Sequence, residues 1–280
     1  MAKITYAKTM NYLRFFSVLL LVTALFQSCE NNKKSWQLNG TSETGSRIYL
    51  YKLKPEVALI DSAKVDQHKF SFSGQNDDER FEVFLVTFDK RGKNGINCLI
   101  ANGDKMNITL NDKMPPVFSG TEISDDLNRY YNIKQQEKKL NFDLSKELEQ
   151  TQLSEEARDQ TMISYREKVQ NLENEKIAFL KSITHADLNA YLVLKELENS
   201  GVVEKEVIGK YRDALTAEGA LTNSGIEVHR IYEFYDAYAI SREMDILDTA
   251  TIRQRYNALN EENKSSVYAR RVLDHLNKMR

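Results

Sequence analysis

The stretch PPVFSGTEISDDLNRYYNI, residues 115–133, separates two parts of this sequence that differ in composition. All three prolines and seven of the eleven glycines lie at or before Gly120, and the 160 residues that follow contain no proline. Because proline and glycine mark turns, the first part should form short strands and the second part long helices. The sequence therefore predicts an α+β fold, with an antiparallel β-sandwich over residues 36–120 and an α-helical domain over residues 121–280.

Short runs of alternating or β-branched residues precede this stretch, as is typical of strands that are buried on one face. Asn102, Gly103 and Asp104 have the composition of a hairpin turn between the last two runs. Seven or so strands of this length favour a sandwich. The runs are Ser46–Lys52, Val57–Ile60, His68–Ser73, Phe81–Phe88, Ile96–Ala101 and Lys105–Leu110.

Helix signals dominate after residue 121. Ser124 and Ser154 are each followed by two acidic residues, which suits the cap and the positive end of a helix. Apolar residues recur at helical spacing in a stripe that Lys176 interrupts: Met162, Tyr165, Val169, Leu172, Phe179 and Ile183. We expect further helices, with Ser224 and Ser265 as caps, at residues 186–199, 203–216, 224–241, 249–260 and 266–279.

An unusual cluster of aromatic residues lies within residues 231–238, which we expect to form one helix. At helical spacing Tyr232 shares a face with Tyr235, and Phe234 shares a face with Tyr238. Such a cluster can stack on a sugar or a peptide. It can equally form the core between helices, with the tyrosine hydroxyls reaching water. Both interpretations stay open, and these four residues are the candidate ligand-binding residues of the sequence.

The N-terminus has the features of a secretory signal. A positive region is formed by Lys3, Lys8 and Arg14. The almost wholly apolar segment 15–26 follows, and its length is that of a signal peptide's apolar region but too short for a helix to span a bilayer. Ser28 then directly precedes Cys29. This junction resembles the lipobox of bacterial lipoproteins, in which the chain is cut before the cysteine, a diacylglyceryl group is attached to its sulfur and its new amine is acylated.

We therefore expect residues 1–28 to be a signal peptide, Cys29 to be lipidated, and residues 29–35 to be a tether. Ordinary cleavage that leaves a free Cys29 is the alternative. Several acyl chains hold a protein stably to a membrane. Only one acidic residue, Glu30, follows the cysteine before Lys33 and Lys34, so we expect a location at the outer membrane that faces the periplasm.

Composition excludes two classes of protein. The formal charge is −2, and it would be near −5 without the three cations of the signal. The sequence therefore lacks the excess of basic residues with which nucleic-acid-binding proteins contact phosphates. Cys98 is the only other cysteine, which excludes a disulfide scaffold. It lies in an apolar run and is expected to be a buried, inert thiol. The sequence carries no catalytic motif, and neither a cofactor nor a metal site is predicted.

Several of these segments resemble one family, the domain of unknown function 4369. That family forms the N-terminal strand domain of many Gram-negative envelope lipoproteins, and the resemblance extends over residues 36–280. His68 stands where the family usually has glycine, and histidine tolerates a left-handed backbone better than most residues. The resemblance rests on Leu38–Gly40, Arg47–Leu50, Leu59–Val65, Lys69–Gly74, Ala101–Asp104, Phe118–Thr121 and Phe179–Tyr191.

Members of this family commonly continue into a thioredoxin-like domain with a Cys-x-x-Cys pair, and this sequence contains no such pair. Thiol–disulfide exchange needs an attacking thiolate and a partner sulfur, so that chemistry is not expected here. The sequence favours a non-enzymatic lipid-anchored envelope protein that binds or scaffolds an envelope protein partner. Two alternatives are an accessory that acts in trans with a separate thioredoxin-like protein, and a protein that binds a glycan or another small ligand where sheet and helices meet.

The lipobox-like junction gives a direct test. Replacing the acylated sulfur by Cys29→Ala should abolish incorporation of labelled palmitate and leave an unprocessed or soluble product. Metabolic labelling and fractionation of the full chain measure both effects. Cys98→Ser is the matched control and should label normally. A Cys29→Ala chain that is processed and held at the membrane like the wild type would refute the lipoprotein assignment.

Overall fold

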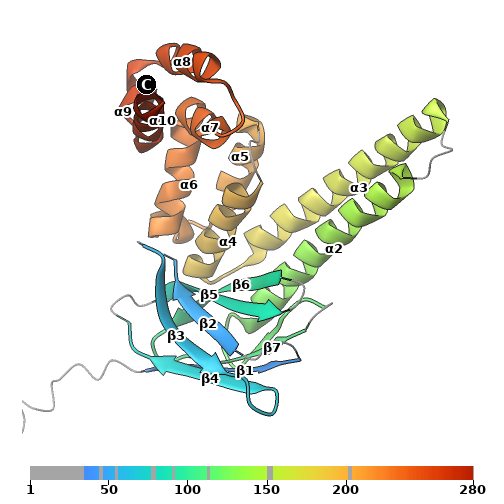
Figure 1. Ribbon diagram of the computed structural model, residues 1–280, viewed down its shortest axis with the longest axis vertical. Helices are drawn as coiled ribbons and strands as arrows, with labels where there is room; N and C mark the ends of the chain where they lie inside the picture. Colours follow the sequence, from blue (N-terminus) through green and yellow to red (C-terminus); the bar gives the residue numbers. More distant parts are fainter. Residues whose placement is uncertain are drawn as a thin grey trace, which may run out of the picture.

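A computed structural model describes residues 35–43, 47–53, 56–76, 80–89, 92–111, 114–149, 154–200 and 204–279. The expected signal peptide and Cys29 lie outside these residues. The described part confirms the predicted fold class, because strands fill the chain up to Ser119 and helices follow from Ser124 (Figure 1).

The described residues contain eight strands, which form two four-stranded sheets packed face to face. The first sheet has the order β4-β1-β7-β8 and the second the order β3-β2-β5-β6. In β1 every second residue from Trp36 is buried, as expected for a strand with one face on a core. The strands are β1 (Trp36–Ser42), β2 (Arg47–Lys52), β3 (Ala58–Lys64), β4 (Lys69–Gly74), β5 (Arg80–Asp89), β6 (Gly92–Ala101), β7 (Lys105–Leu110) and β8 (Val117–Ser119).

The connections within the sandwich differ from the prediction in two ways. The turn at residues 102–104 forms, with Gly103 at φ 95°, but it is not a hairpin, because β6 and β7 belong to different sheets. β1 pairs in parallel with β7, so the sandwich is antiparallel except for this one pair. Strands β1 and β8 were not among the predicted runs. β8 has only three residues, too few to show an alternation.

The turn before β4 carries the histidine that replaces the family's glycine. Gln67 and His68 both adopt positive φ, 47° and 64°, and Asp66 bonds with Lys69 across the turn. The His68 Nδ1 atom lies 3.2 Å from the Ser42 carbonyl oxygen. The prediction that histidine preserves this left-handed turn is confirmed.

The helical part begins with two long helices that form an antiparallel arm, and a compact group of shorter helices follows (Figure 1). The segment 186–199 was predicted with its observed bounds. The elements are α2 (Ser124–Leu148), α3 (Glu155–Ser182), α4 (Ala186–Asn199), α5 (Lys205–Arg212), the 3₁₀ helix η1 (Gly219–Leu221), α6 (Asn223–Glu233), α7 (Tyr235–Glu243), α8 (Thr249–Asn257), α9 (Glu261–Ser265) and α10 (Val267–Lys278).

The prediction of one helix over 224–241 is wrong, because Phe234, at φ −101° and ψ 36°, separates α6 from α7. Neither proline nor glycine stands there, so the sequence carried no signal for the break. The segments predicted as 203–216 and 249–260 are likewise shorter, since α5 ends at Arg212 and α8 at Asn257.

The helix caps were predicted with mixed success. Ser154 caps α3 as predicted, by accepting a hydrogen bond from the Ala157 amide. Thr222 caps α6 and Ser266 caps α10, so Ser224 and Ser265 were the wrong residues. The Ser124 hydroxyl makes no cap; it instead accepts a hydrogen bond from the Thr121 amide.

Helix α2 closes the open side of the sandwich, where β8 and β6 are the edge strands of the two sheets. The Asn128 side chain accepts from the Phe118 amide of β8 at 2.7 Å and donates to the Phe118 carbonyl at 2.9 Å. The Tyr131 hydroxyl accepts from the Asn97 amide of β6 at 3.1 Å and donates to the Asn97 carbonyl at 2.5 Å. Two side chains of one helix thus stand in for a missing strand at both edges, and both backbone pairs are satisfied.

Removal of the Tyr131 hydroxyl tests this docking. Tyr131→Phe retains the ring against Phe118 but leaves the amide and carbonyl of Asn97 without their partner. An unsatisfied buried pair of this kind costs about 1–3 kcal/mol, and we expect that loss in the free energy of unfolding measured with urea.

Tyr165→Phe is the matched control, because the Tyr165 hydroxyl donates to Asn141 at an exposed position of the arm. It should change the unfolding free energy by less than about 0.5 kcal/mol. Equal effects of the two substitutions would contradict the role assigned to Tyr131.

Candidate functional site

Helix α4 lies between the sandwich and the other helices, and buried charges hold it there. Glu196 of α4 is only 2% exposed and accepts a hydrogen bond from the Tyr130 hydroxyl of α2 at 2.6 Å. Lys176 of α3 reaches Glu196 at 2.8 Å and Glu137 at 2.7 Å, and Lys134 of α2 reaches Glu196 at 3.1 Å. The lysine that interrupts the apolar stripe of the sequence is therefore the centre of an ion network between three helices.

The physical state of these groups follows from their contacts. Burial alone would raise the pKa of Glu196, but Lys176 and Lys134 outweigh burial and hold that pKa below its ordinary value. Burial lowers the pKa of Lys176, and Glu196 and Glu137 more than reverse this effect, so the pKa lies above its ordinary value. Both groups are therefore charged at neutral pH.

A second buried contact fixes α4 to the sandwich. Glu82 of β5 accepts from Lys195 of α4 at 2.7 Å and from the Tyr191 hydroxyl at 3.2 Å. Lys195 also pairs with Glu198 at 2.9 Å. Because Glu82 is buried, the charge of Lys195 compensates a carboxylate that would otherwise lie unpaired inside the protein.

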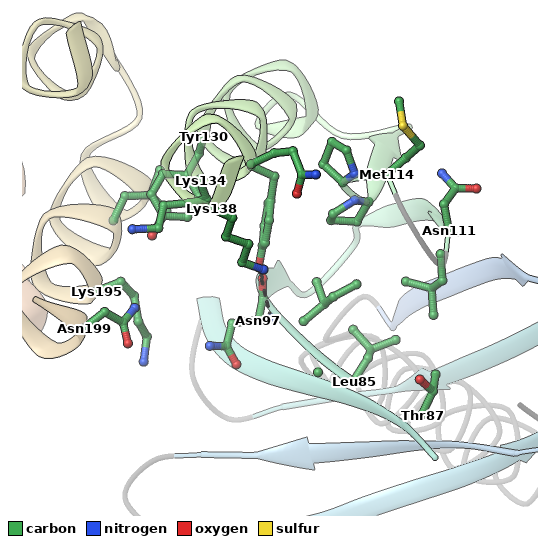
Figure 2. A pocket seen from close by; sticks show the side chains of 18 of the residues that line it. Leu85, Thr87, Asn97, Asn111, Met114, Tyr130, Lys134, Lys138, Lys195 and Asn199 are labelled. Carbon is green, nitrogen blue, oxygen red and sulfur yellow. Dashed lines mark hydrogen bonds between the residues drawn. The ribbon is translucent and has the colours of Figure 1, made fainter. Parts of the chain in front are cut away.

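A cavity of about 490 Å³ opens where the sandwich, α2 and α4 meet, and we call it the junction cavity (Figure 2). Its size lies in the range of small-molecule sites, about 300–1,000 Å³. The apolar part of its wall includes Leu85, Ile96, Leu110, Met114, Pro115 and Pro116. The polar part includes three lysines and four carboxamides: Lys134, Lys138, Lys195, Asn97, Asn111, Gln135 and Asn199.

Lysine side chains line the junction cavity, whereas their carboxylate partners do not. Among the residues that the structure describes, its lining contains no aspartate or glutamate. The carboxylates that neutralise Lys134 and Lys195 stand behind the wall, on Glu137, Glu196, Glu82 and Glu198. Within the part of the chain that the structure describes, Lys138 has no such partner. Among its described residues, the cavity therefore presents one uncompensated ammonium group beside two compensated lysines and several carboxamides.

The predicted aromatic residues do not form one platform. The Tyr232 ring lies beneath Arg212 and Lys205 of α5, with the Arg212 Cζ 3.9 Å from the ring centroid. Tyr238 is buried against Tyr268 of α10, and its hydroxyl donates to the Leu197 carbonyl at 3.3 Å. The helix break at Phe234 separates the two rings.

Phe234 and Tyr235 pack, partly buried, against the core. Of the four predicted residues, Tyr238 lines a second cavity of about 810 Å³ that also contains Glu227 and Arg242. A ligand-binding role for the four aromatics stays a prediction.

Cys98 is fully buried inside the sandwich, as predicted. Burial, with Glu82 and Asp104 adding to it, raises the pKa of its thiol far above the ordinary value, so a reactive thiolate is disfavoured. Among the described residues no three His, Cys, Asp or Glu side chains are grouped as a metal ion requires. No described helix is both long and apolar enough to cross a membrane.

The lining residues of the junction cavity were not predicted from the sequence. They come from segments as distant as β6 and α4, and each alone is an ordinary polar residue. The only local signal was the spacing of Tyr131, Lys134, Gln135 and Lys138, which places these four residues on one face of a helix.

The strand domain matches a known family over part of the chain. Residues 36–127 match the domain of unknown function (DUF4369). This confirms the resemblance for the sandwich and the first turn of α2, and the DUF4369 match ends just before Asn128. The helical run 179–191, which also entered the resemblance, lies beyond it. Comparison with curated proteins and with solved structures returned no match.

The ion network around Glu196 gives a test of how α4 is held. Glu196→Gln removes the charge that compensates Lys176 and Lys134, and breaking such a buried pair costs about 3–5 kcal/mol of unfolding free energy. Because the folded-state pKa of Glu196 is lowered, its contribution is present above an ordinary glutamate pKa of about 4.3 and is lost as the pH falls through the lower folded value.

Urea unfolding at several pH values measures this effect. The difference between wild type and Glu196→Gln should be full at pH 7 and should narrow as the pH falls below about 4. Glu175→Gln, at an exposed position of α3, is the control and should differ little from wild type at any pH. A difference that does not depend on pH would contradict the assigned charge state.

Proposed function

We propose that this chain is a non-enzymatic protein of the bacterial cell envelope, lipid-anchored through Cys29 on the periplasmic side of the outer membrane, which binds a small ligand in the junction cavity. The anchor is supported by the positive N-terminus, the apolar segment 15–26 and the Ser28–Cys29 junction. The binding role is supported by one observation above all, the half-polar junction cavity between the sandwich and the helices.

The chemistry of the cavity wall favours binding over catalysis. Two of its hydroxyl groups, on Tyr130 and Tyr191, already donate to the buried carboxylates of Glu196 and Glu82. The described residues of the lining include no histidine or carboxylate that would activate Ser42 or Thr87 as a nucleophile. Burial raises the pKa of Tyr130 and Tyr131, so these phenols stay protonated. A wall of carboxamides, phenols and lysine ammonium groups orients a ligand through hydrogen bonds without reacting with it.

A scaffolding role for an envelope protein partner is the second candidate, and the arm of α2 and α3 favours it. The apolar residues of the distal arm are not buried by the two helices alone: Phe142 is 67% and Ile163 48% exposed. Of the predicted stripe on α3, Phe179 near the base is fully buried, whereas Val169 is 39% exposed. An exposed apolar surface of this kind is typical of a contact with another protein.

Ligand screening of the purified full-length chain tests the binding proposal. A panel of neutral and acidic saccharides, amino acids, short peptides and nucleosides should contain members that raise the thermal unfolding temperature. Asn111→Ala and Asn199→Ala, on opposite sides of the cavity, should each weaken binding of those members about tenfold, as titration calorimetry measures.

Asn174→Ala is the control, because Asn174 is exposed on α3 and bonds with Gln170 of the same helix. It should bind like the wild type. A panel without any stabilising member, or binding that is unchanged in both cavity variants, would reject the junction cavity as the ligand site.

A further inference from the structure

We propose, building on the function proposed above, that the ligand of the junction cavity is a small saccharide that carries one carboxylate, as a uronic acid does. Three features of the wall lead to this class of ligand. They are the four carboxamides, Lys138, which has no acidic partner among the described residues, and the apolar residues beside them.

The carboxamides converge on the cavity from four separate elements. Asn97 belongs to β6, Asn111 follows β7, Gln135 lies on α2 and Asn199 ends α4. Figure 2 shows Asn97, Asn111 and Asn199 around the same space. Asn97 and Asn111 are half-buried, whereas Gln135 and Asn199 stand at the exposed rim.

These four side chains are available for a ligand. Within the described residues, none of them makes a side-chain hydrogen bond, whereas Asn128, Asn189 and Asn263 elsewhere in the chain are fully engaged. A carboxamide offers a donor and an acceptor in fixed geometry, and a sugar hydroxyl also both donates and accepts. Several free carboxamides around one cavity therefore fit a ligand with several hydroxyl groups.

The charged group of the ligand follows from Lys138. Lys134 and Lys195 already pair with carboxylates, whereas Lys138 has no partner in the part of the chain that the structure describes and is free to engage a ligand. One ammonium suits one carboxylate, with which it forms a charge-assisted hydrogen bond. The described residues of the lining include no acidic side chain that would pair with the ammonium of an amino acid or a peptide N-terminus, whereas Lys138 would pair with a carboxylate.

The remaining surface fits the carbon face of a sugar ring. Met114, Pro115 and Pro116 are consecutive apolar residues of the lining. Figure 2 shows Met114 on the side of the cavity away from Lys195 and Asn199 of α4. A pyranose ring has C–H groups on one face and hydroxyl groups at its edge, so it can contact these apolar residues while the carboxamides bind its edge. A volume of about 490 Å³ leaves room for one or two rings.

A comparison of each acidic saccharide with its uncharged methyl ester separates the effect of the ligand's charge on binding from the effect of its shape. The probes are galacturonate and the hyaluronan disaccharide, which each carry one carboxylate, and each is compared with its methyl ester. Titration calorimetry measures their binding to the full-length chain. At least one acid should bind, and about tenfold more tightly than its ester. Lys138→Gln should remove that preference and leave ester binding unchanged.

Lys139→Gln is the control, because Lys139 is the next residue of α2 but lines a groove of the arm instead of the cavity. It should retain the preference for the acid. If neutral saccharides or other panel members bind through Asn111 and Asn199 while the acids show no preference, the acidic-saccharide inference fails and the proposed binding function stands. If nothing binds, both fail together with the cavity as a site.

Discussion

The docking of α2 on the two sheet edges is the contact on which the rest of the structure depends. An exposed sheet edge carries unpaired amides and carbonyls, and proteins protect such edges by covering them. Here Asn128 satisfies β8 and Tyr131 satisfies β6, one turn apart on the same helix. Because each side chain both donates and accepts, the pairing fixes the position of the helix along both strands. This contact therefore fixes where α2, the first helix of the arm, leaves the sandwich.

Helix α4 connects the rest of the helical part to the sandwich, and buried ion pairs as well as apolar contacts hold it there. Glu82 and Lys195 cross from β5 to α4, while Glu196, Lys176 and Lys134 join α4 to the two arm helices. A buried ion pair adds little net stability compared with apolar packing, but an incorrect arrangement would leave a charge unpaired. The networks therefore favour one position of α4 over its alternatives. The buried apolar core also continues from the strands into the helices without interruption.

The sequence predicted what depends on local periodicity and missed what depends on contacts between distant segments. The change from strands to helices, the bounds of α4, the cap at Ser154, the turn at His68 and the buried Cys98 could all be read from nearby residues. The parallel pairing of β1 with β7 could not, because a strand has the same alternation in either direction. The break at Phe234 had no proline or glycine to signal it. The aromatic cluster drew attention because it is contiguous in sequence, whereas the junction cavity is assembled from residues of β6, α2 and α4.

The availability of the cavity follows from the helical repeat of α2. Tyr131, Lys134 and Lys138 lie on one face of this helix, at positions i, i+3 and i+7. The Tyr131 hydroxyl bonds with the edge strand β6. Lys134, one turn further along the helix, forms ion pairs with Glu196 and Glu137. Lys138 lies one further turn along the helix, beyond the contacts with the sheet and with the carboxylates, and it still lines the junction cavity. The contacts of Tyr131 and Lys134 fix the position of the helix, so the backbone that carries this wall of the cavity is placed before a ligand binds. A preorganised wall of this kind loses little conformational entropy on binding, which favours a ligand held by a few hydrogen bonds.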